Sequence, residues 1–452
     1  MLRTTYMANR PRLPPGPRLP ALVQTALWFG RPIPFMDWCR RRYGDCVTLR
    51  LGFGPAMVMV SDPALVDGIL AAPPEVAPTG PENAILEPLL GPRSVLMLDG
   101  PEHLRQRKLL LPFFHGERMR RHEATIASIT EREVDGWPVG RTFELLPRMR
   151  AITFEVILRI VFGVEDPTRL DKLGTMLSRL LAMGSSWLVL PWVQHDLGPR
   201  SPWGRFIRLK AAIDGLLVNE ISARRADPSL EEREDVLSQL LQARDEEGNQ
   251  LTDEELRDQL MTLLVAGHET TATSLAWCLD LLLHRPDLVV PTSESRQLTD
   301  AVIRETLRLR APFRLVSRRL VAPLQVGAYR LPAGVAVGVN TYLTHRRTEV
   351  YPDPEAFRPE RFLSAQDGPP PAPLAPPPPA SGGGNAWVPF GGGVRRCLGA
   401  SFATFEMSVV LRAILRRVRL RPVSPRPEAI SLHAVILVPK LGARVVREPS
   451  EP

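Results

Sequence analysis

One cysteine follows three consecutive glycines near the C-terminal end of the chain, and this stretch constrains the fold more than any other. It runs from Phe390 to Ala400 and reads Phe-Gly-Gly-Gly-Val-Arg-Arg-Cys-Leu-Gly-Ala. Glycine lets the backbone come close to a flat ligand, and an apolar helical run begins directly after Cys397. The N–H groups at the start of a helix favour a nearby thiolate. The sequence therefore predicts that Cys397 binds a soft metal through sulfur.

The spacing of this stretch resembles the cysteine loop of the cytochrome P450 family, the haem-thiolate monooxygenases. The family pattern Phe-x-x-Gly-x-Arg-x-Cys-x-Gly is filled at every fixed position, by Phe390, Gly393, Arg395, Cys397 and Gly399. The resemblance extends from about residue 14 to the C-terminus. It also rests on three further family motifs, which stand in the family's order: Ala-Gly-His-Glu-Thr-Thr at 266–271, Glu-Thr-Leu-Arg at 305–308 and Phe-Arg-Pro-Glu-Arg-Phe at 357–362.

The resemblance implies a fold and a cofactor. The fold is mainly α with small β sheets (α+β), and haem b lies between the long central helix and the helix of the cysteine loop. Cys397 is the implied iron ligand. Four residues are implied to contact the haem propionates, and the first two stand four apart on one face of a helix predicted from Asp99: His103, Arg107, Arg318 and Arg395. The other implied haem contacts are Ala266, Phe390, Gly391 and Gly399.

A long apolar helix is predicted at the centre of the chain. Thr252 and Glu255 form a capping-box pattern, and helical periodicity continues for roughly 33 residues, which at ~1.5 Å each gives a helix of about 50 Å. A membrane span is the alternative interpretation of such a helix. The polar side chains His268 and Glu269 in its middle would be costly in lipid, so a buried helix is favoured.

The middle of this helix carries the implied catalytic residues. Gly267 weakens the helix locally, and a threonine hydroxyl can bond to a preceding carbonyl. The resemblance implies that Glu269 relays protons and that the hydroxyl of Thr270 acts beside it at the oxygen site. His268 is interpreted as structural, because its position varies in the family.

Three further residues resemble the family's buried ionic triad. Glu305 and Arg308 lie three apart on one helical turn, and Arg361 is the third member. The triad is implied to hold the cysteine loop in place. In the extended stretch 312–318, Phe313 and Val316 are implied to face the substrate pocket.

The chain is predicted to form a proline-rich N-terminal segment at 1–20 and a single catalytic domain at 21–452. Its composition, 44% hydrophobic and 23% charged residues, is ordinary for a globular protein. Within the domain we expect a long loop at 71–93, implied to cover the substrate, a hairpin over 329–339, and, at 285–297, a stretch whose prolines put one family helix in doubt. A small β-rich region is expected at about 44–62 and 313–340, and an inserted Pro/Gly-rich loop at about 367–385.

Composition also limits the classes of binding partner and the location that we expect. The net charge is +8, yet no basic run or aromatic-interleaved basic motif indicates nucleic acid. The four cysteines are scattered, which indicates neither a disulfide framework nor a zinc site. The apolar piece at 21–29 is too short to cross a bilayer. A cytoplasmic monomer without a membrane span is therefore expected.

The resemblance implies a monooxygenase that uses O2 to hydroxylate or epoxidise an apolar small molecule, such as a fatty acid, terpenoid, steroid or polyketide, in a setting of secondary metabolism. The 55 residues after Cys397 are too few for a flavin domain. Electrons are therefore expected from a ferredoxin or flavodoxin with its reductase. Arg105, Lys108 and Arg396 form the hypothesised docking patch for an acidic ferredoxin. Two alternatives stay open: a peroxide-dependent or isomerising haem-thiolate enzyme, and a haem-binding sensor or carrier without turnover.

Overall fold

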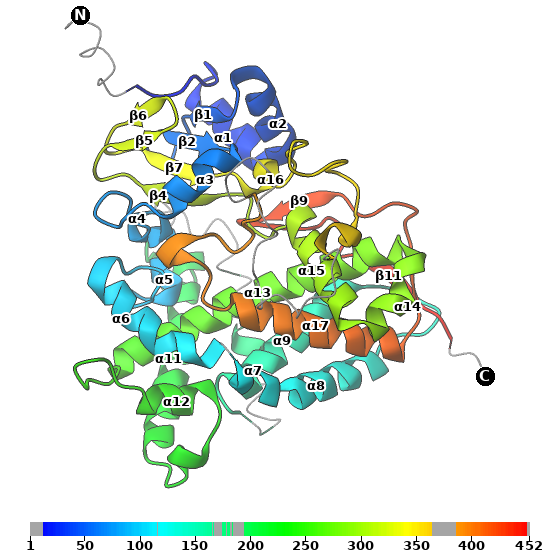
Figure 1. Cartoon of the computed structure of the whole chain (residues 1–452). Helices are drawn as coiled ribbons and strands as arrows, with labels where there is room; N and C mark the ends of the chain where they lie inside the picture. Colours follow the sequence, from blue (N-terminus) through cyan, green and yellow to red (C-terminus); the bar gives the residue numbers. More distant parts are fainter. Residues whose placement is uncertain are drawn as a thin grey trace, which may run out of the picture. The chain divides into compact units, whose positions relative to one another are not determined.

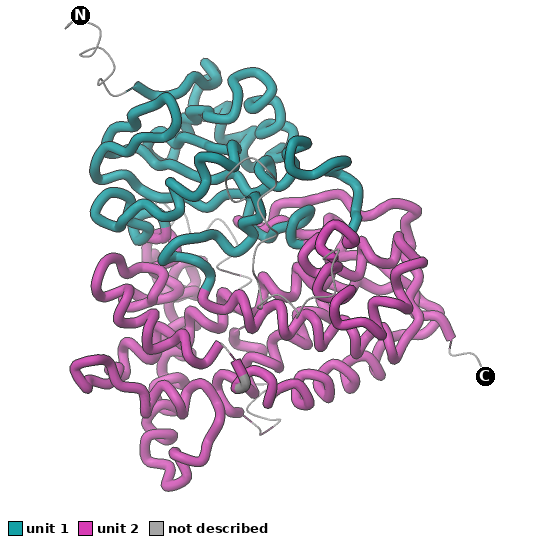
Figure 2. The backbone as a smooth tube through the Cα atoms, viewed as in Figure 1, with its two compact units in different colours: residues 1–82, 307–358, 364–397 teal, residues 83–306, 359–363, 398–452 magenta. Residues whose placement is uncertain are grey.

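The computed structural model describes residues 12–114, 116–164, 166, 174–177, 179–180, 183, 194–363 and 386–449 (Figure 1). The predicted insertion at 367–385 lies outside the described residues, and so do the first eleven residues of the N-terminal segment. The chain divides into two compact units (Figure 2). Unit 1 comprises Met1–Glu82, Leu307–Arg358 and Ser364–Cys397, and unit 2 comprises Asn83–Thr306, Pro359–Leu363 and Leu398–Pro452.

Unit 1 is built on a small mixed sheet, as expected for the predicted β-rich region. The strand order is β1-β2-β7-β4, with β1 antiparallel to β2, β2 parallel to β7 and β4 antiparallel to β7. The strands are β1 (Cys46–Leu49), β2 (Met57–Val60), β4 (Val316–Arg319) and β7 (Ala336–Val339), and the helices are α1 (Ala21–Gly30), α2 (Pro32–Tyr43), α3 (Pro63–Leu70) and α16 (Thr341–Thr344).

The valines of this sheet form its core with α3. Val58, Val60, Val337 and Val339 have less than a hundredth of their surface exposed, and they pack with Val66 of α3. β-branched side chains favour strands because they pack well on a pleated surface.

The hairpin predicted over 329–339 is wrong. Strand β6 (Tyr329–Leu331) pairs instead with the preceding β5 (Leu324–Val326), and the chain then leaves this hairpin to place β7 beside β2. The turn around Gly327, with φ 55°, closes the observed hairpin. Tertiary packing decides which short strands pair, because neighbouring strands show the same alternation of side chains between the two faces.

Unit 2 is mainly helical and is organised around α13 (Asp253–Leu283), the predicted central helix. Its capping box is present: the Thr252 hydroxyl accepts from the Glu255 N–H at 3.2 Å, and the Glu255 carboxylate accepts from the Thr252 N–H at 2.8 Å. The other helices are α5 (Glu87–Leu90), α6 (Gly100–Leu110), α7 (Glu117–Arg121), α8 (Glu123–Asp135), α9 (Leu145–Ile160), α11 (Pro202–Arg225), α12 (Val236–Gln242), α14 (Pro286–Glu294) and α17 (Ala400–Arg417), and α15 (Arg296–Leu309) runs across the boundary of the units.

The described part of unit 2 also contains two small sheets. Strand β11 (Arg444–Arg447) pairs antiparallel with both β3 (Thr142–Glu144) and β8 (Leu420–Pro422). Strands β9 (Ile430–His433) and β10 (Ile436–Pro439) form a hairpin. Trp277 of α13 is fully buried and donates to the Leu437 carbonyl at 3.0 Å, so the central helix is fixed to this hairpin.

Two expectations about loops need correction. The stretch 71–93 is not a plain loop, because it contains the short helices α4 (Gly80–Asn83), η2 (Ala84–Leu86) and α5. The stretch after the central helix does form a helix, α14, despite its prolines. Pro286 stands in the first turn, where its missing N–H has no helical partner. Pro291 has no N–H to give to the carbonyl of Asp287, a loss that the remaining turns tolerate.

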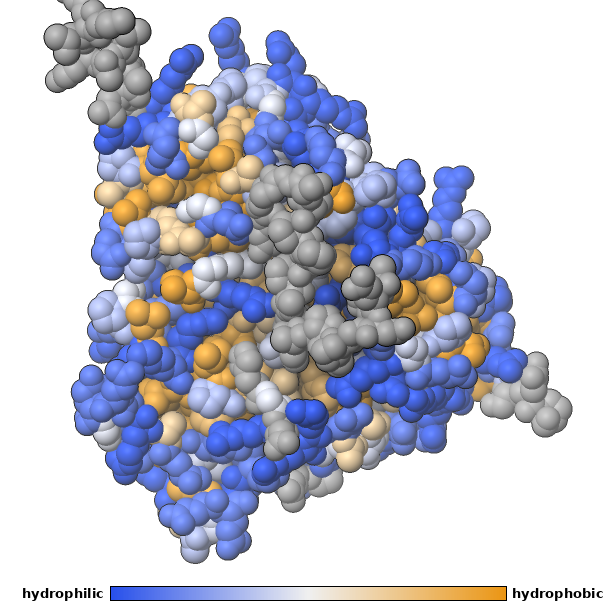
Figure 3. Space-filling model, viewed as in Figure 1, coloured by the Kyte–Doolittle hydropathy of each residue, from blue (hydrophilic) through white to orange (hydrophobic). Residues whose placement is uncertain are grey.

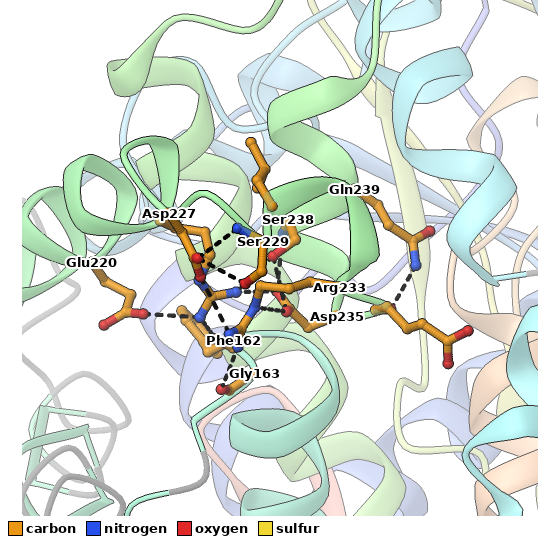
Figure 4. A network of polar contacts seen from close by, with 12 residues as sticks. Phe162, Gly163, Glu220, Asp227, Ser229, Arg233, Asp235, Ser238 and Gln239 are labelled. Carbon is orange, nitrogen blue, oxygen red and sulfur yellow. Dashed lines mark hydrogen bonds and ion pairs between the residues drawn. The ribbon is translucent and has the colours of Figure 1, made fainter.

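A buried polar network joins α11 to α12 (Figure 4). The Arg224 guanidinium donates to Asp235 at 2.5 Å, to Ser238 at 2.7 Å and to the Phe162 carbonyl at 2.9 Å. A Cβ on Gly163, where φ is 61°, would lie 2.6 Å from the Asp235 carboxylate, so glycine permits this close approach. Because Arg224 is only 5% exposed, the network fixes how α11 packs on α12.

Candidate functional site

The Cys397 loop of unit 1 is closed by a backbone hydrogen bond. The Cys397 N–H donates to the Phe390 carbonyl at 2.9 Å, and the Gly391 and Arg396 N–H groups donate to Val388 and Gly393 within the loop. Gly391 and Gly393 have φ values of 66° and 62°. These are left-handed conformations that glycine adopts without strain. The loop thus presents the Cys397 side chain, which is exposed.

The glycines also let the loop lie against the end of α3. A Cβ on Gly392 would be 2.9 Å from the Leu70 side chain, and one on Gly393 would be 2.2 Å from the Leu70 carbonyl oxygen. At Gly393 the neighbour is backbone, so no side chain fits there, whereas at Gly392 the Leu70 side chain would have to shift. Packing inside unit 1 therefore requires glycine at 393, in addition to the left-handed φ of Gly391 and Gly393.

His345 links the loop to another part of unit 1. Its Nδ1 lies 3.0 Å from the Arg308 carbonyl, and its Nε2 accepts from the Val388 N–H at 2.9 Å. Burial lowers the pKa of His345 to about 3, and the nearby Arg308 charge adds to this effect. The ring is therefore neutral, with the proton on Nδ1, and it fixes the backbone at the start of the Cys397 loop.

Strand β4 carries Val316 and Arg318, and Phe313 lies shortly before it in unit 1. Arg318 is 3% exposed, and its Nη1 donates to the Ser317 carbonyl at 3.1 Å. Val316 begins the strand close to Gly391, since a Cβ on that glycine would lie 3.9 Å from it. Phe313 is partly exposed, and its carbonyl accepts from the Thr341 hydroxyl. Unit 1 thus brings Val316 to the Cys397 loop.

Helix α13 is less buried in its middle than along the turns that follow. Ala266 is exposed, although most of α13 is buried. The Thr270 hydroxyl donates to the Ala266 carbonyl at 2.6 Å, which confirms the predicted back-bonding. Gly267 has a packing role that the sequence did not suggest, because a Cβ there would lie 3.1 Å from Ile157 of α9. An open helix segment of this kind suits a flat ligand.

Glu269 is held by an arginine of α9. Arg150 Nε donates to one carboxylate oxygen at 2.9 Å, and its Nη2 donates to the other, so the pair is bidentate. Both side chains are partly exposed, 34% for Arg150 and 20% for Glu269. A planar guanidinium fixes the orientation of a carboxylate in such a pair. Sequence reasoning missed Arg150, which belongs to no motif and lies 119 residues before Glu269.

His268 faces α9 and is buried, in keeping with its structural interpretation. Its Nδ1 lies 3.0 Å from the Thr153 hydroxyl, and its ring meets Phe154 edge-on with centroids 5.1 Å apart. Burial, with a smaller contribution from Arg150, lowers the pKa of His268 to about 3. The neutral ring packs α13 against α9.

Helix α6 begins as predicted, with Pro101 in its first turn. His103 is buried and Arg107 half-buried one turn further along. The docking residues on this helix are engaged within unit 2: Arg105 pairs with Asp245 at 2.6 Å and with Glu255 at 2.9 Å. Lys108 pairs with Glu246 at 2.7 Å on the surface.

Of the implied triad residues, Glu305 and Arg308 are fully buried and Arg361 is partly buried, and all three form hydrogen bonds. Arg361 Nε donates to Glu305 at 3.1 Å, and Glu305 has no exposed surface. Arg308, also fully buried, donates to the carbonyls of His345 at 2.8 Å and Pro354 at 2.7 Å, and its guanidinium lies 4.9 Å from the centre of the Tyr351 ring. His345 is the second residue that sequence reasoning missed. Its carbonyl accepts from the Arg308 guanidinium, and its ring Nδ1 lies 3.0 Å from the Arg308 carbonyl.

The cysteine chemistry fits an iron bound through one sulfur. Burial raises the pKa of the Cys39 and Cys278 thiols to about 12 and that of Cys46 to about 11, so these three thiols stay protonated. Cys397 is the exposed one. Among the described residues, no group of three or more His, Cys, Asp or Glu side chains is placed to hold a metal ion. A single thiolate with a haem is consistent with this donor set.

Glu269 and Thr270 line neither of two clefts in the described part of unit 2. One of about 580 Å³ lies beside Lys108, Phe113 and Arg118, and the other, of about 440 Å³, lies beside Arg224 and Arg233. No helix in the described part of the chain has the length and apolar character needed to cross a membrane.

Comparisons with known proteins agree with the motifs. The sequence profile described as Cytochrome P450 matches residues 14–446. The chain is 42% identical over 445 residues to a protein of Mycobacterium tuberculosis named as a cytochrome P450 135B1, covering 96% of this chain and 91% of that protein. It is 41% identical over 416 residues to one named as a cytochrome P450 137, covering 91% and 84%.

Solved structures show the same fold. The cyanobacterial CYP120A1 with bound retinoic acid superposes with a TM-score of 0.79 at 26% identity, covering 97% of this chain and all of that chain. CYP175A1 from Thermus thermophilus gives 0.72 at 28% identity, with the same coverage. With four motifs, a profile match over nearly the whole length and these relatives, the chain belongs to the cytochrome P450 family of haem-thiolate monooxygenases.

Proposed function

We propose that this protein inserts one atom of O2 into an apolar small molecule, by hydroxylation or epoxidation of a fatty acid, terpenoid, steroid or polyketide. The observation that carries the proposal is the closed glycine loop that presents Cys397 while the other three thiols are buried or half-buried. Haem, when bound, supplies the oxygen-transfer chemistry, which a thiolate ligand favours. The retinoic acid in the CYP120A1 structure, a largely apolar molecule, supports the substrate class.

The family motifs assign the haem contacts to these residues. Cys397 would supply the sulfur ligand, with Phe390, Gly391 and Gly399 beside it and Ala266 of α13 leaving room for a flat ring. The propionates would be met by Arg318, Arg395, His103 and Arg107. Guanidinium groups suit carboxylates because they donate in a fixed planar fork.

Glu269 and Thr270 would manage protons on α13. The Thr270 hydroxyl donates its one proton to the Ala266 carbonyl at 2.6 Å and can also accept a hydrogen bond, so it would have to turn away from that carbonyl to pass a proton onward. Arg150 orients the Glu269 carboxylate, and the carboxylate must leave this pair to collect a proton from water. Phe313 and Val316 would contribute apolar surface toward the substrate.

Electrons would come from a ferredoxin or flavodoxin with its reductase, acting on a monomer. The hypothesised patch on α6 needs revision, because Arg105 and Lys108 are already paired with Asp245, Glu255 and Glu246. Reversing their charges would break these pairs as well as any docking contact. Ionic strength is therefore the cleaner probe of docking.

The first experiment is the carbon monoxide difference spectrum of the reduced protein, followed by titration with fatty acids, terpenes and steroids. We expect a Soret band at the red-shifted thiolate position, lost in Cys397→Ser but kept in Cys46→Ser. A band at the histidine-type position in the unmodified protein would contradict thiolate ligation. Binding of substrates without substrate-dependent consumption of reductant would identify a haem-binding sensor instead.

A further inference from the structure

Helix α1 leaves several apolar side chains exposed and buries a polar one, Gln24, beside Trp28. Leu22 is 79% exposed and Phe29 is 44% exposed, whereas Gln24 is only 1% exposed. A surface helix of a globular protein normally shows the opposite distribution. The helix also contains no charged residue. Its outer face is therefore an apolar surface that the described residues of unit 1 leave uncovered.

Gln24 fixes this inverted orientation. Its amide nitrogen donates to the Leu19 carbonyl at 2.8 Å and to the Pro17 carbonyl at 3.3 Å, and its oxygen accepts from the Arg50 N–H at 3.0 Å. All polar groups of the side chain are thus satisfied inside unit 1. Rotating α1 to bury Leu22 would break these bonds, so the exposure belongs to the folded state.

The turn between β1 and β2 extends the same surface. The Gly52 N–H donates to the Thr25 hydroxyl of α1 at 2.9 Å, and the Phe53 ring lies 5.6 Å from the Phe29 ring. Phe53 is 45% exposed. We call the following five exposed side chains the α1 patch: Leu19, Leu22, Val23, Phe29 and Phe53. In the space-filling view, hydrophobic surface (orange) lies beside hydrophilic surface (blue) over the part of unit 1 where Figure 1 labels α1, β1 and β2 (Figure 3).

Arginines flank the α1 patch. Arg18 precedes it, Arg31 follows α1 and Arg50 precedes the β1–β2 turn, and all three are exposed. Residues 12–55 contain seven arginines and two aspartates, with no lysine or glutamate, so this segment carries a net charge of +5 (7 − 2). One of the two aspartates, Asp45, pairs with Arg40 and Arg347. An apolar face with a cationic border complements a surface that is apolar within and anionic at its rim.

We propose that the α1 patch docks this protein on an anionic lipid surface, with Leu22, Phe29 and Phe53 entering the headgroup region. Arginine stems can lie along the apolar layer while their guanidinium groups reach lipid phosphates. A second copy of the chain is a poor occupant, because two such faces would bring two +5 segments together. The inference goes beyond the proposed function and does not depend on it.

Flotation of the full-length protein with lipid vesicles tests the proposal. Vesicles of phosphatidylcholine alone are compared with vesicles that also contain phosphatidylglycerol, at low salt. We expect binding to the anionic vesicles, reduced at least ~10-fold by Leu22→Glu and by Phe29→Ser. Replacing Arg18, Arg31 and Arg50 together by glutamine should also reduce it at least ~10-fold, since each arginine near an anionic surface changes binding by about fivefold.

Leu197→Glu is the matched control, because Leu197 of unit 2 is 83% exposed, much like Leu22. It should leave binding unchanged. An equal loss in Leu197→Glu, equal binding to both kinds of vesicle, or no binding to either would overturn the proposal. A concentration-dependent dimer that Leu22→Glu abolishes would also overturn it, by assigning the patch to a second copy. The assay uses no substrate or reductant, so its failure is distinct from failure of the proposed function.

Discussion

Arg150 and Glu269 show how one side chain can restrain another on a neighbouring helix. The bidentate contact holds the carboxylate against α9, while the Thr270 hydroxyl one residue later bonds back to its own helix. An arginine in this position orients the acid but leaves it partly exposed to water. The two neighbours on α13 are therefore held differently: the Glu269 carboxylate by an arginine of another helix, and the Thr270 hydroxyl by a carbonyl of its own helix.

We predict that Glu269→Gln lowers substrate-dependent turnover by about 100-fold, because general acid and base groups typically contribute about 10²–10⁴-fold. An amide keeps the shape of the side chain but cannot relay a proton. Glu155→Gln is the control, since Glu155 is a partly exposed carboxylate of α9 that pairs with Arg159. Turnover measured with saturating reductant should fall only in the first variant. Equal turnover in both variants would remove Glu269 from the mechanism.

Two buried histidines predict a loss of stability in acid. His268 and His345 both have a pKa of about 3 in the folded protein, against about 6.5 in an unfolded chain. Below about pH 6.5 the unfolded state therefore binds more protons, and the free energy of unfolding falls as pH falls. Between about pH 7 and about pH 5 each histidine should remove about 2 kcal/mol.

Urea unfolding at these two pH values checks this expectation. His345→Gln keeps an acceptor for the Val388 N–H and should lose its share of the pH dependence, although it is less stable at neutral pH. His433→Gln is the control, because His433 is exposed at the end of β9. A pH dependence that is the same in both variants would show that His345 takes up its proton without unfolding.

At the scale of elements, α11 depends on one arginine. Arg224 is buried and bonds to the Asp235 carboxylate, the Ser238 hydroxyl and the Phe162 carbonyl, so three segments of unit 2 meet at one guanidinium. The next residue, Arg225, points to the surface and pairs with Asp253 there. We therefore expect these two adjacent arginines to contribute very differently to the free energy of unfolding.

We predict that Arg224→Met lowers the free energy of unfolding by about 3–5 kcal/mol, because it leaves the Asp235 charge buried without its main partner. Arg225→Met should change it by less than about 1 kcal/mol, since exposed pairs contribute little. Urea denaturation midpoints of the two variants give the comparison. Similar midpoints would show that water replaces the Arg224 contacts at no cost.

The elements also show which features of secondary structure local sequence signals can predict. The capping box at Thr252 and the proline at the start of α6 are local signals, and both helices begin where these signals place them. The hairpin over 329–339 failed because β7 found its partners in β2 and β4, and β2 lies far away in the sequence. Local patterns define a strand, but they do not name its neighbour.

For the whole molecule, the net charge of +8 predicts how a redox partner is found. Long-range attraction speeds the encounter with an acidic ferredoxin, and salt screens it, since the Debye length falls from ~10 Å at ~0.1 M to ~3 Å at ~1 M. We expect the rate of reduction by such a ferredoxin to fall at least ~10-fold between low and high salt. Reduction by dithionite, a small molecule, is the reference. A rate that does not change with salt would exclude electrostatic docking.

The sequence by itself determined the family and the central residues of the proposed site. Cys397 and Gly393 stand in one contiguous motif, and so do Glu269 and Thr270, because a loop that must turn back on itself and a helix that must open locally need specific residues at fixed spacing. These requirements are local, and a local requirement can be read from residue order. The same holds for the starts of α6 and α13.

Only the tertiary structure decided which residues support that site and which surface stays open. Arg150 reaches Glu269 from α9, His345 reaches Val388, and Gln24 reaches Arg50 while Leu22 and Phe29 of α1 stay exposed. Each of these contacts joins residues or faces that the chain brings together only by folding, and hydrogen bonding and burial reward them only in that arrangement. A hydrophobic pattern states that a face is apolar, whereas packing decides whether that face is covered.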